Sequence, residues 1–108
     1  MDHNGLSGFF KKQVERGMNV AEKVYTITDE SGLHARPSTI LVNTVNKFAS
    51  DVNVEYEGKT VNLKSVMGVL SLGVIRGAQL KVVATGSDEE ELLSALTEAM
   101  KENNLISE

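Results

Sequence analysis

The sequence predicts an α+β fold in which an antiparallel sheet is covered by helices on one face. Four short segments alternate apolar and polar residues, which is typical of strands with one buried face. Three other segments carry their apolar residues at helical spacing, on a single stripe. The order of these segments along the 108-residue chain is β-α-β-β-α-β-α. A chain of this length is expected to form one compact domain.

The predicted strands are short and are bounded by turn residues. In the first strand, Tyr25 and Ile27 share one side, while Thr26 and Thr28 share the other. Gly58 marks a tight turn between the second strand and the third. The four strands cover residues 23–28, 51–57, 60–63 and 80–85.

The first helix is predicted over residues 35–48, around the only proline of the chain. Pro37 fits the first turn of a helix, and it biases the residue before it away from helical angles. The apolar residues that follow have the spacing of a helix packed on a core. They are Ile40, Leu41, Val45 and Phe48.

Two further helices are predicted in the second half of the chain. A short helix covers residues 66–72 and ends near Gly73. The last helix reaches about residue 103, and Ser87 followed by Glu90 has the capping-box pattern at its start. Its apolar stripe consists of Leu92, Leu93, Leu96, Ala99 and Met100.

The composition argues against several classes of function. The chain has no cysteine and only two histidines, far apart, so we expect no disulfide, no metal site and no cofactor. The lack of cysteine suits the cytoplasm, and no apolar run approaches the roughly 20 residues of a membrane span. Residues 18–108 carry a net charge of −5 without a basic cluster, which argues against direct nucleic-acid binding.

Residues 1–17 are expected to form an extension that precedes a domain at residues 18–108. The aromatic and basic pairs at 9–12 predict a short amphipathic helix. Met18 is a credible native start, because residues 15–17 can be encoded by a purine-rich run like a ribosome-binding site. The extension would then come from a mis-called start and have no function. A docking extension is the alternative.

His34 and Arg36 lie at the predicted entrance of the first helix, in the run Gly32-Leu33-His34-Ala35-Arg36-Pro37. The first-turn N–H groups of a helix have no partner within it, and with the helix dipole they attract anions. An imidazole at such a place can take a phosphoryl group on nitrogen. Because a lone histidine at a helix start is more often a surface or capping residue, a second motif is needed.

That second motif covers residues 61–73 and contains Lys64-Ser65-Val66-Met67-Gly68. Together the two motifs resemble those of HPr, the histidine-containing phosphocarrier family of the bacterial phosphoenolpyruvate:sugar phosphotransferase system, in its Gram-positive form. The similarity runs from about Asn19 to the C-terminus. The resemblance implies an open-faced β-sandwich, with four antiparallel strands in the order 1-4-2-3 and three helices on one face.

HPr proteins accept a phosphoryl group from phosphorylated enzyme I and pass it to IIA domains of sugar permeases, as carriers rather than independent enzymes. By this resemblance, His34 accepts the group on Nδ1 and has to be exposed. Arg36 pairs with the phosphoryl oxygens, and the backbone N–H groups of Ala35 and Arg36 add donors. Ser31 is a weaker candidate for a phosphate contact, and Ser38 stands where many relatives have Ala.

Ser65 has the position of an N-cap for the short helix. The resemblance also makes it the target of HPr kinase/phosphorylase, whose product slows phosphorylation by enzyme I and is a corepressor for the catabolite control protein. The short helix has more apolar residues than one buried stripe needs, and the resemblance implies that Val66, Met67 and Leu70 form an exposed docking patch. We expect a monomer. A purely regulatory HPr-like paralogue is the alternative, although such relatives lack the acceptor histidine.

Overall fold

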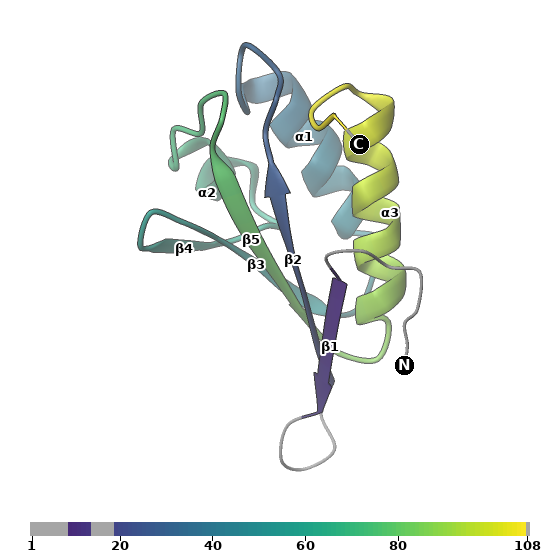
Figure 1. Ribbon diagram of the computed structural model, residues 1–108. Coiled ribbons are helices and arrows are strands. Elements are labelled where there is room, and N and C mark those ends of the chain that lie inside the picture. Colours follow the sequence, from purple (N-terminus) through teal and green to yellow (C-terminus); the bar gives the residue numbers. More distant parts are fainter. Residues whose placement is uncertain (1–8, 14–18, 108) are drawn as a thin grey trace.

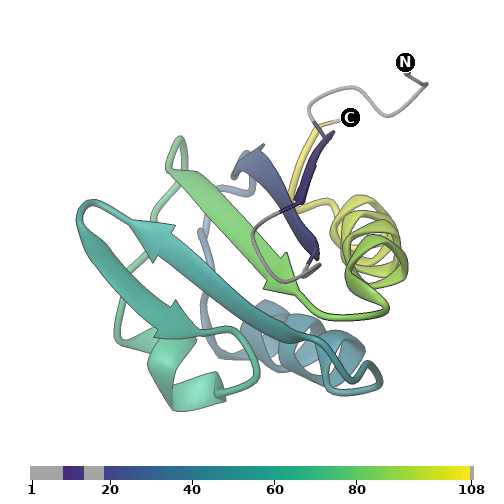
Figure 2. The ribbon, with the colours of Figure 1, turned by 90° about the horizontal axis from the view of Figure 1, so that it is seen from below.

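The computed structural model describes residues 9–13 and 19–107. It contains one curved sheet with the helices on one face, as Figure 1 and the view from below in Figure 2 show. The strands are β1 (Phe9–Gln13), β2 (Asn19–Thr26), β3 (Asp51–Tyr56), β4 (Lys59–Asn62) and β5 (Gln79–Thr85). The helices are α1 (Ala35–Val45), α2 (Val66–Leu70) and α3 (Glu89–Glu102). Within the described residues, no helix has the length and apolar character that crossing a bilayer requires.

The sheet has the strand order β1-β2-β5-β3-β4, and each neighbouring pair is antiparallel. The four strands predicted from the sequence are β2, β3, β4 and β5. Numbered among themselves, these four have the order 1-4-2-3, which confirms the topology implied by the resemblance. Both β-strand neighbours of β5 are distant in sequence, so local patterns alone do not give this order.

β1 is a fifth strand that the sequence analysis did not predict. It pairs with β2 at the edge of the sheet, in a register that places Phe9 opposite Lys23. The helix expected at 9–12 is therefore wrong. An edge strand offers unpaired backbone groups, and pairing with them decides the conformation of a segment whose own periodicity is weak. The remainder of segment 1–17, together with Met18, lies outside the described residues.

The buried face of the sheet follows the predicted alternation. In β3, Val52 and Val54 are buried, and in β5 every second residue from Leu80 onward is buried. Helices α1 and α3 pack against each other and supply the opposite side of this core. Their buried apolar residues are Leu41, Val42, Val45, Leu92, Leu93, Leu96 and Met100. Burial of this apolar surface is the main term that stabilises the fold.

Tyr25 joins β2 to α3 through its hydroxyl group. The hydroxyl lies 2.7 Å from the hydroxyl of Thr97, which itself donates to the Leu93 carbonyl at 2.8 Å. Burial raises the pKa of Tyr25 to about 12, and the hydrogen bond with Thr97 offsets part of that rise. The phenol therefore stays neutral in the folded protein over the physiological range.

The N-terminus of α3 differs from the predicted capping box. Its N-cap is Asp88 and not Ser87. The Asp88 carboxylate accepts hydrogen bonds from the backbone N–H groups of Ala49 and Ser50, both at 2.9 Å, and from the Ser50 hydroxyl. These hydrogen bonds, that of the Ser50 side chain first, lower the pKa of Asp88. The sequence pattern failed here because the carboxylate binds a segment distant in the chain rather than its own helix.

The C-terminal segment belongs to the core beyond the predicted end of α3. Asn104 has a φ of 59°, and the next N–H group, that of Leu105, donates to the Met100 carbonyl at 2.9 Å. This is the geometry of a Schellman motif, which ends a helix with a left-handed residue. Leu105 is buried, and its carbonyl accepts from the Thr28 N–H at 2.8 Å. The motif thus attaches the end of the chain to the strand that leads into the candidate site.

Candidate functional site

His34 is the N-cap residue of α1, with an extended backbone at φ −87° and ψ −169°. Its side chain makes no capping hydrogen bond to the helix, and the residue is exposed. Its carbonyl accepts the first bond of the helix, from the Ser38 N–H at 3.1 Å. The backbone of His34 therefore starts the helix, while the imidazole remains accessible to a partner.

Two backbone N–H groups are available beside the imidazole. The first α-helical bond is made by Ser38, and Pro37 has no N–H group. The amides of Ala35 and Arg36 are therefore the first-turn donors that the helix itself cannot satisfy. Ala35 and Arg36 are both exposed to solvent. A dianion at this end of α1 would meet two amides and the positive end of the helix dipole.

The loop that carries His34 is held by the segment that follows α2. The Leu33 N–H donates to the Val74 carbonyl at 3.1 Å. Gly32 has a φ of +64°, and a Cβ atom there would collide with the Val74 carbonyl oxygen. Only glycine fits this close approach. Ser31, the weaker candidate, is exposed on the same loop.

Ser38 is fully buried below this loop. Its hydroxyl lies 3.5 Å from the Leu33 carbonyl oxygen, to which it donates. A serine in place of alanine is a small change in side-chain size. The structure adds that its hydroxyl contacts the peptide that precedes His34.

Ser65 caps α2, which confirms its predicted structural role. Its backbone is extended, and its hydroxyl oxygen accepts a hydrogen bond from the Gly68 N–H at 3.1 Å. The residue is exposed. The Ser65 hydroxyl therefore caps the helix and lies on an exposed residue.

The residues before Ser65 are attached to the far end of α1 by contacts that sequence reasoning missed. The Lys64 ammonium group donates to the Phe48 carbonyl at 2.8 Å, just beyond the C-terminus of α1. In the other direction, the side-chain amide of Asn46 donates to the Lys64 carbonyl at 3.3 Å. These contacts join residues far apart in the chain, so no local pattern could reveal them.

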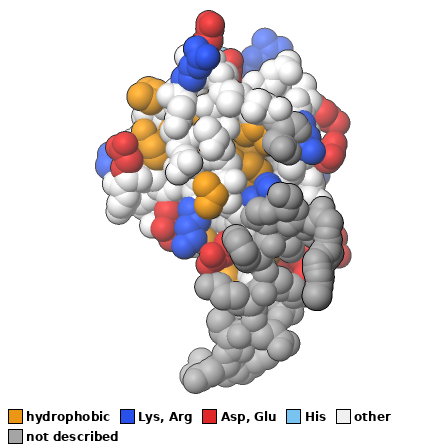
Figure 3. Space-filling view, in the orientation of Figure 1, with side chains coloured by type: hydrophobic (Ala, Val, Ile, Leu, Met, Phe, Trp, Pro, Cys, Tyr) orange, Lys and Arg blue, Asp and Glu red, His pale blue; other side chains and the backbone are white. Residues whose placement is uncertain are grey.

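The three residues expected in the docking patch differ in exposure. Met67 is 76% exposed, whereas Val66 and Leu70 are half-buried. Val69, by contrast, is buried against the core. Figure 3 shows the face of the molecule that is turned toward the viewer in Figure 1, where hydrophobic side chains form small separate patches among polar atoms. The short helix therefore does present apolar surface to the solvent.

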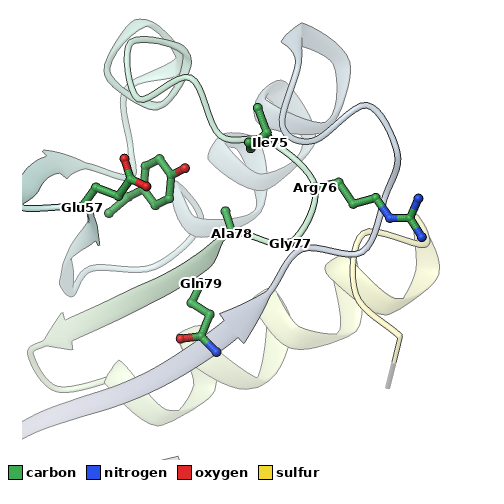
Figure 4. Close-up of a pocket in the computed structure, with 7 residues that line it drawn as sticks. Glu57, Ile75, Arg76, Gly77, Ala78 and Gln79 are labelled. Carbon is green, nitrogen blue, oxygen red and sulfur yellow. The ribbon is translucent and has the colours of Figure 1, made fainter.

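One pocket of about 460 Å³ is lined by the loop that follows α2 and by the turn after β3, and it contains neither His34 nor Ser65. It is lined by Tyr56, Glu57, Ile75, Arg76, Gly77, Ala78 and Gln79. Figure 4 shows that Arg76 points away from it, so its polar groups do not converge on one ligand. No three histidine or carboxylate side chains lie close enough to hold a metal ion in the part of the chain that the structure describes.

Comparison with known proteins identifies the family. The sequence profile described as "PTS HPr component phosphorylation site" matches residues 21–102. This chain therefore belongs to the HPr family of phosphocarriers of the phosphotransferase system.

Solved structures agree with this assignment. The histidine-containing phosphocarrier protein of Mycoplasma is 32% identical over 81% of this chain and 99% of its own length, with a TM-score of 0.79. HPr of Thermoanaerobacter tengcongensis is 45% identical over 74% of this chain and 90% of its own, with a TM-score of 0.71. Crh of Bacillus subtilis, a catabolite repression protein solved as a swapped dimer, is 43% identical over 68% of this chain and 85% of its own length, with a TM-score of 0.61.

Proposed function

We propose that this protein is a phosphoryl carrier that uses His34 as its acceptor. The observation that carries the proposal is the exposed imidazole at the N-terminus of α1, beside two first-turn amides and Arg36. Membership of the HPr family supports the same role.

The chemistry is an in-line transfer of the phosphoryl group to His34 from a second active-site group. Nδ1 of neutral His34 attacks the phosphorus atom of phosphorylated enzyme I, so that the new N–P bond forms while the bond between phosphorus and the donor group breaks. The guanidinium of Arg36 and the amides of Ala35 and Arg36 stabilise the phosphoryl oxygens. In the second step the group leaves for an IIA domain of a sugar permease, and neutral imidazole returns. No cofactor takes part.

Ser65 is proposed as the regulatory site, phosphorylated from ATP by HPr kinase/phosphorylase. The N-terminus of a helix tolerates the added charge of about −1.5 to −2. Val66, Met67 and Leu70 lie directly after Ser65 and are the proposed contacts for enzyme I and the other partners. The added dianion would oppose docking there, and the phosphoserine form would act on transcription through the catabolite control protein.

The remaining assignments follow from the same family role. The functional domain is residues 18–108, with residues 1–17 as an extension, and the protein acts as a monomer in the cytoplasm without direct contact to nucleic acid or membrane. In the cell it would serve sugar transport and catabolite repression.

The second candidate function is a purely regulatory HPr-like protein that acts only through Ser65. The similarity to Crh favours it. The presence of His34 together with Arg36 argues for the carrier, because regulatory relatives of this kind lack the acceptor histidine.

The decisive experiment incubates the protein with phosphoenolpyruvate and enzyme I, and measures acid-labile phosphate on the protein. The wild type should be labelled, and His34→Ala should lose more than about 1,000-fold of the rate because the nucleophile is removed. Acid-labile phosphate that survives in His34→Ala would overturn the assignment. An unlabelled wild type that still accepts acid-stable phosphate from HPr kinase/phosphorylase would establish the regulatory alternative.

A further inference from the structure

The loop after α2 exposes an isoleucine close to the candidate site. Ile75 is 66% exposed, and neither the docking patch nor any motif in the sequence includes it. Single exposed hydrophobic residues are common on protein surfaces. The position and rigidity of Ile75 are what distinguish it.

Ile75 lies next to the loop that carries His34. The ideal Cβ position of Gly32 is 2.9 Å from the Ile75 Cα atom. Because consecutive Cα atoms are about 3.8 Å apart, the Cα atoms of His34 and Ile75 are within about 12 Å of each other. Met67, which is also highly exposed, lies on the preceding helix.

The backbone holds Ile75 firmly in this place. The Ala78 N–H donates to the Ile75 carbonyl at 3.1 Å, which closes a turn with Gly77 at φ +89°. Two further hydrogen bonds attach the turn to Ile27, the residue after the end of β2. The Gly77 N–H donates to the Ile27 carbonyl at 2.7 Å, and the Ile27 N–H donates to the Ala78 carbonyl at 2.9 Å. In Figure 4, Ile75 and Arg76 leave this turn in different directions.

An interface of ordinary size centred on His34 reaches as far as this turn. A specific interface buries about 800 Å² on each partner, which corresponds to a disc with a radius of about 16 Å. A β-branched side chain on a fixed turn loses little conformational entropy when it is covered. A polar residue would satisfy the turn equally well, so the exposed Ile75 has no evident role in the fold.

We propose that Ile75 is a docking residue for the protein that donates the phosphoryl group to His34, and that this donor meets it with an apolar surface. The proposal rests on the carrier function proposed above. It extends the docking patch from α2 to the segment that follows this helix, beside the loop that bears His34.

The test measures transfer from phosphorylated enzyme I to the full-length protein over a range of protein concentrations. Ile75→Thr should raise KM about 3- to 10-fold with kcat at saturation unchanged, because it removes docking and leaves the reacting groups in place. Ile75→Leu, which remains apolar, should stay within about twofold of the wild type. Val24→Thr is the matched control, since Val24 is 53% exposed on β2 and lies outside the site.

The results separate the docking role from the carrier role. If the wild type accepts no phosphoryl group, the carrier function fails before any variant is compared. If the wild type is active and Ile75→Thr has an unchanged KM, the docking role of Ile75 is wrong. An equal rise in KM for Val24→Thr would also overturn it, because the effect would then not depend on position. Thermal unfolding of Ile75→Thr should match the wild type, as expected for an exposed side chain.

Discussion

The two candidate phosphorylation sites are built in opposite ways. His34 starts α1 with its backbone alone, and its side chain makes no capping bond. Ser65 caps α2 with the same hydroxyl that would be modified. The fold therefore does not depend on the imidazole, whereas it does use the serine oxygen. A carrier needs a side chain that can gain and lose a group at every cycle, and the arrangement at His34 permits this without breaking a capping hydrogen bond of the fold.

The contacts that hold His34 in place also differ in kind from those that hold Ser65. The loop that carries His34 is fixed from outside by the contact between Gly32 and Val74. Ser65 is fixed by its own cap and by the attachment of Lys64 to Phe48. Substitutions can therefore disturb one region without the other.

The largest effect is expected for Gly32→Ala. The new Cβ would collide with the Val74 carbonyl and force the loop away, so we expect a loss of about 2–4 kcal/mol in unfolding free energy. Transfer to His34 should fall about 10- to 100-fold, because small displacements of reacting groups are costly. Chemical denaturation and the rate of labelling by enzyme I measure the two effects.

Gly73→Ala is the control for this prediction. Gly73 has a φ of +63°, close to that of Gly32, but a Cβ there would meet no atom within 4 Å. It should lose only the roughly 1–2 kcal/mol of a left-handed residue. Equal losses in the two variants would show that the contact with Val74 does not hold the loop. Phosphorylation of Ser65 by the kinase should remain normal in folded Gly32→Ala.

A smaller effect is expected for Ser65→Asp, which separates charge from capping. Aspartate caps a helix about as well as serine, so the unfolding free energy should stay within about 0.5 kcal/mol of the wild type. The added charge on the docking face should slow labelling of His34 about 3- to 10-fold. The measurement is the initial rate with enzyme I at low and high salt, since screening should reduce the difference.

Ser65→Ala should show the reverse pattern. It loses the bond from the Gly68 N–H and about 1 kcal/mol of stability, while labelling of His34 remains at the wild-type rate. An unchanged rate in Ser65→Asp would count against electrostatic regulation. A slow rate in Ser65→Ala would place the cause in the helix cap instead.

The sequence predicted what depends on local pattern. The alternation of Val52 and Val54 and the cap at Ser65 are both local, and both are confirmed. The exposure of His34 also agrees with the expectation from the motif. Its role as acceptor, like that of Ser65 as a kinase target, stays a prediction.

What the sequence did not reveal comes from contacts between distant segments. β1 is a strand because it lies beside β2, and the N-cap of α3 is Asp88, whose carboxylate binds Ser50. Leu105 enters the core only because the chain turns back beyond α3. Ile75 lacks any periodic pattern, and only its approach to Gly32 gives it a place near the site.

The smallest effect on the two sites is expected for Asp88→Asn, which alters a third region. The folded-state pKa of Asp88 is below its ordinary value of 3.8, because Ser50 and two backbone N–H groups bind the charged form. The carboxylate therefore stabilises the fold fully at pH values above about 3.8, and this contribution is lost as the pH falls through the lowered pKa. Asp88→Asn should accordingly lower the Tm at pH 7, and its Tm should converge with that of the wild type in strong acid.

Asp51→Asn, which changes an exposed carboxylate on β3, is the control and should leave the Tm at pH 7 nearly unchanged. Labelling of His34 by enzyme I should be normal in both variants at 25 °C, because Asp88 binds Ala49 and Ser50 and Asp51 lies at the start of β3. A Tm difference for Asp88→Asn that persists undiminished at low pH would show that packing, and not the charge, holds the start of α3.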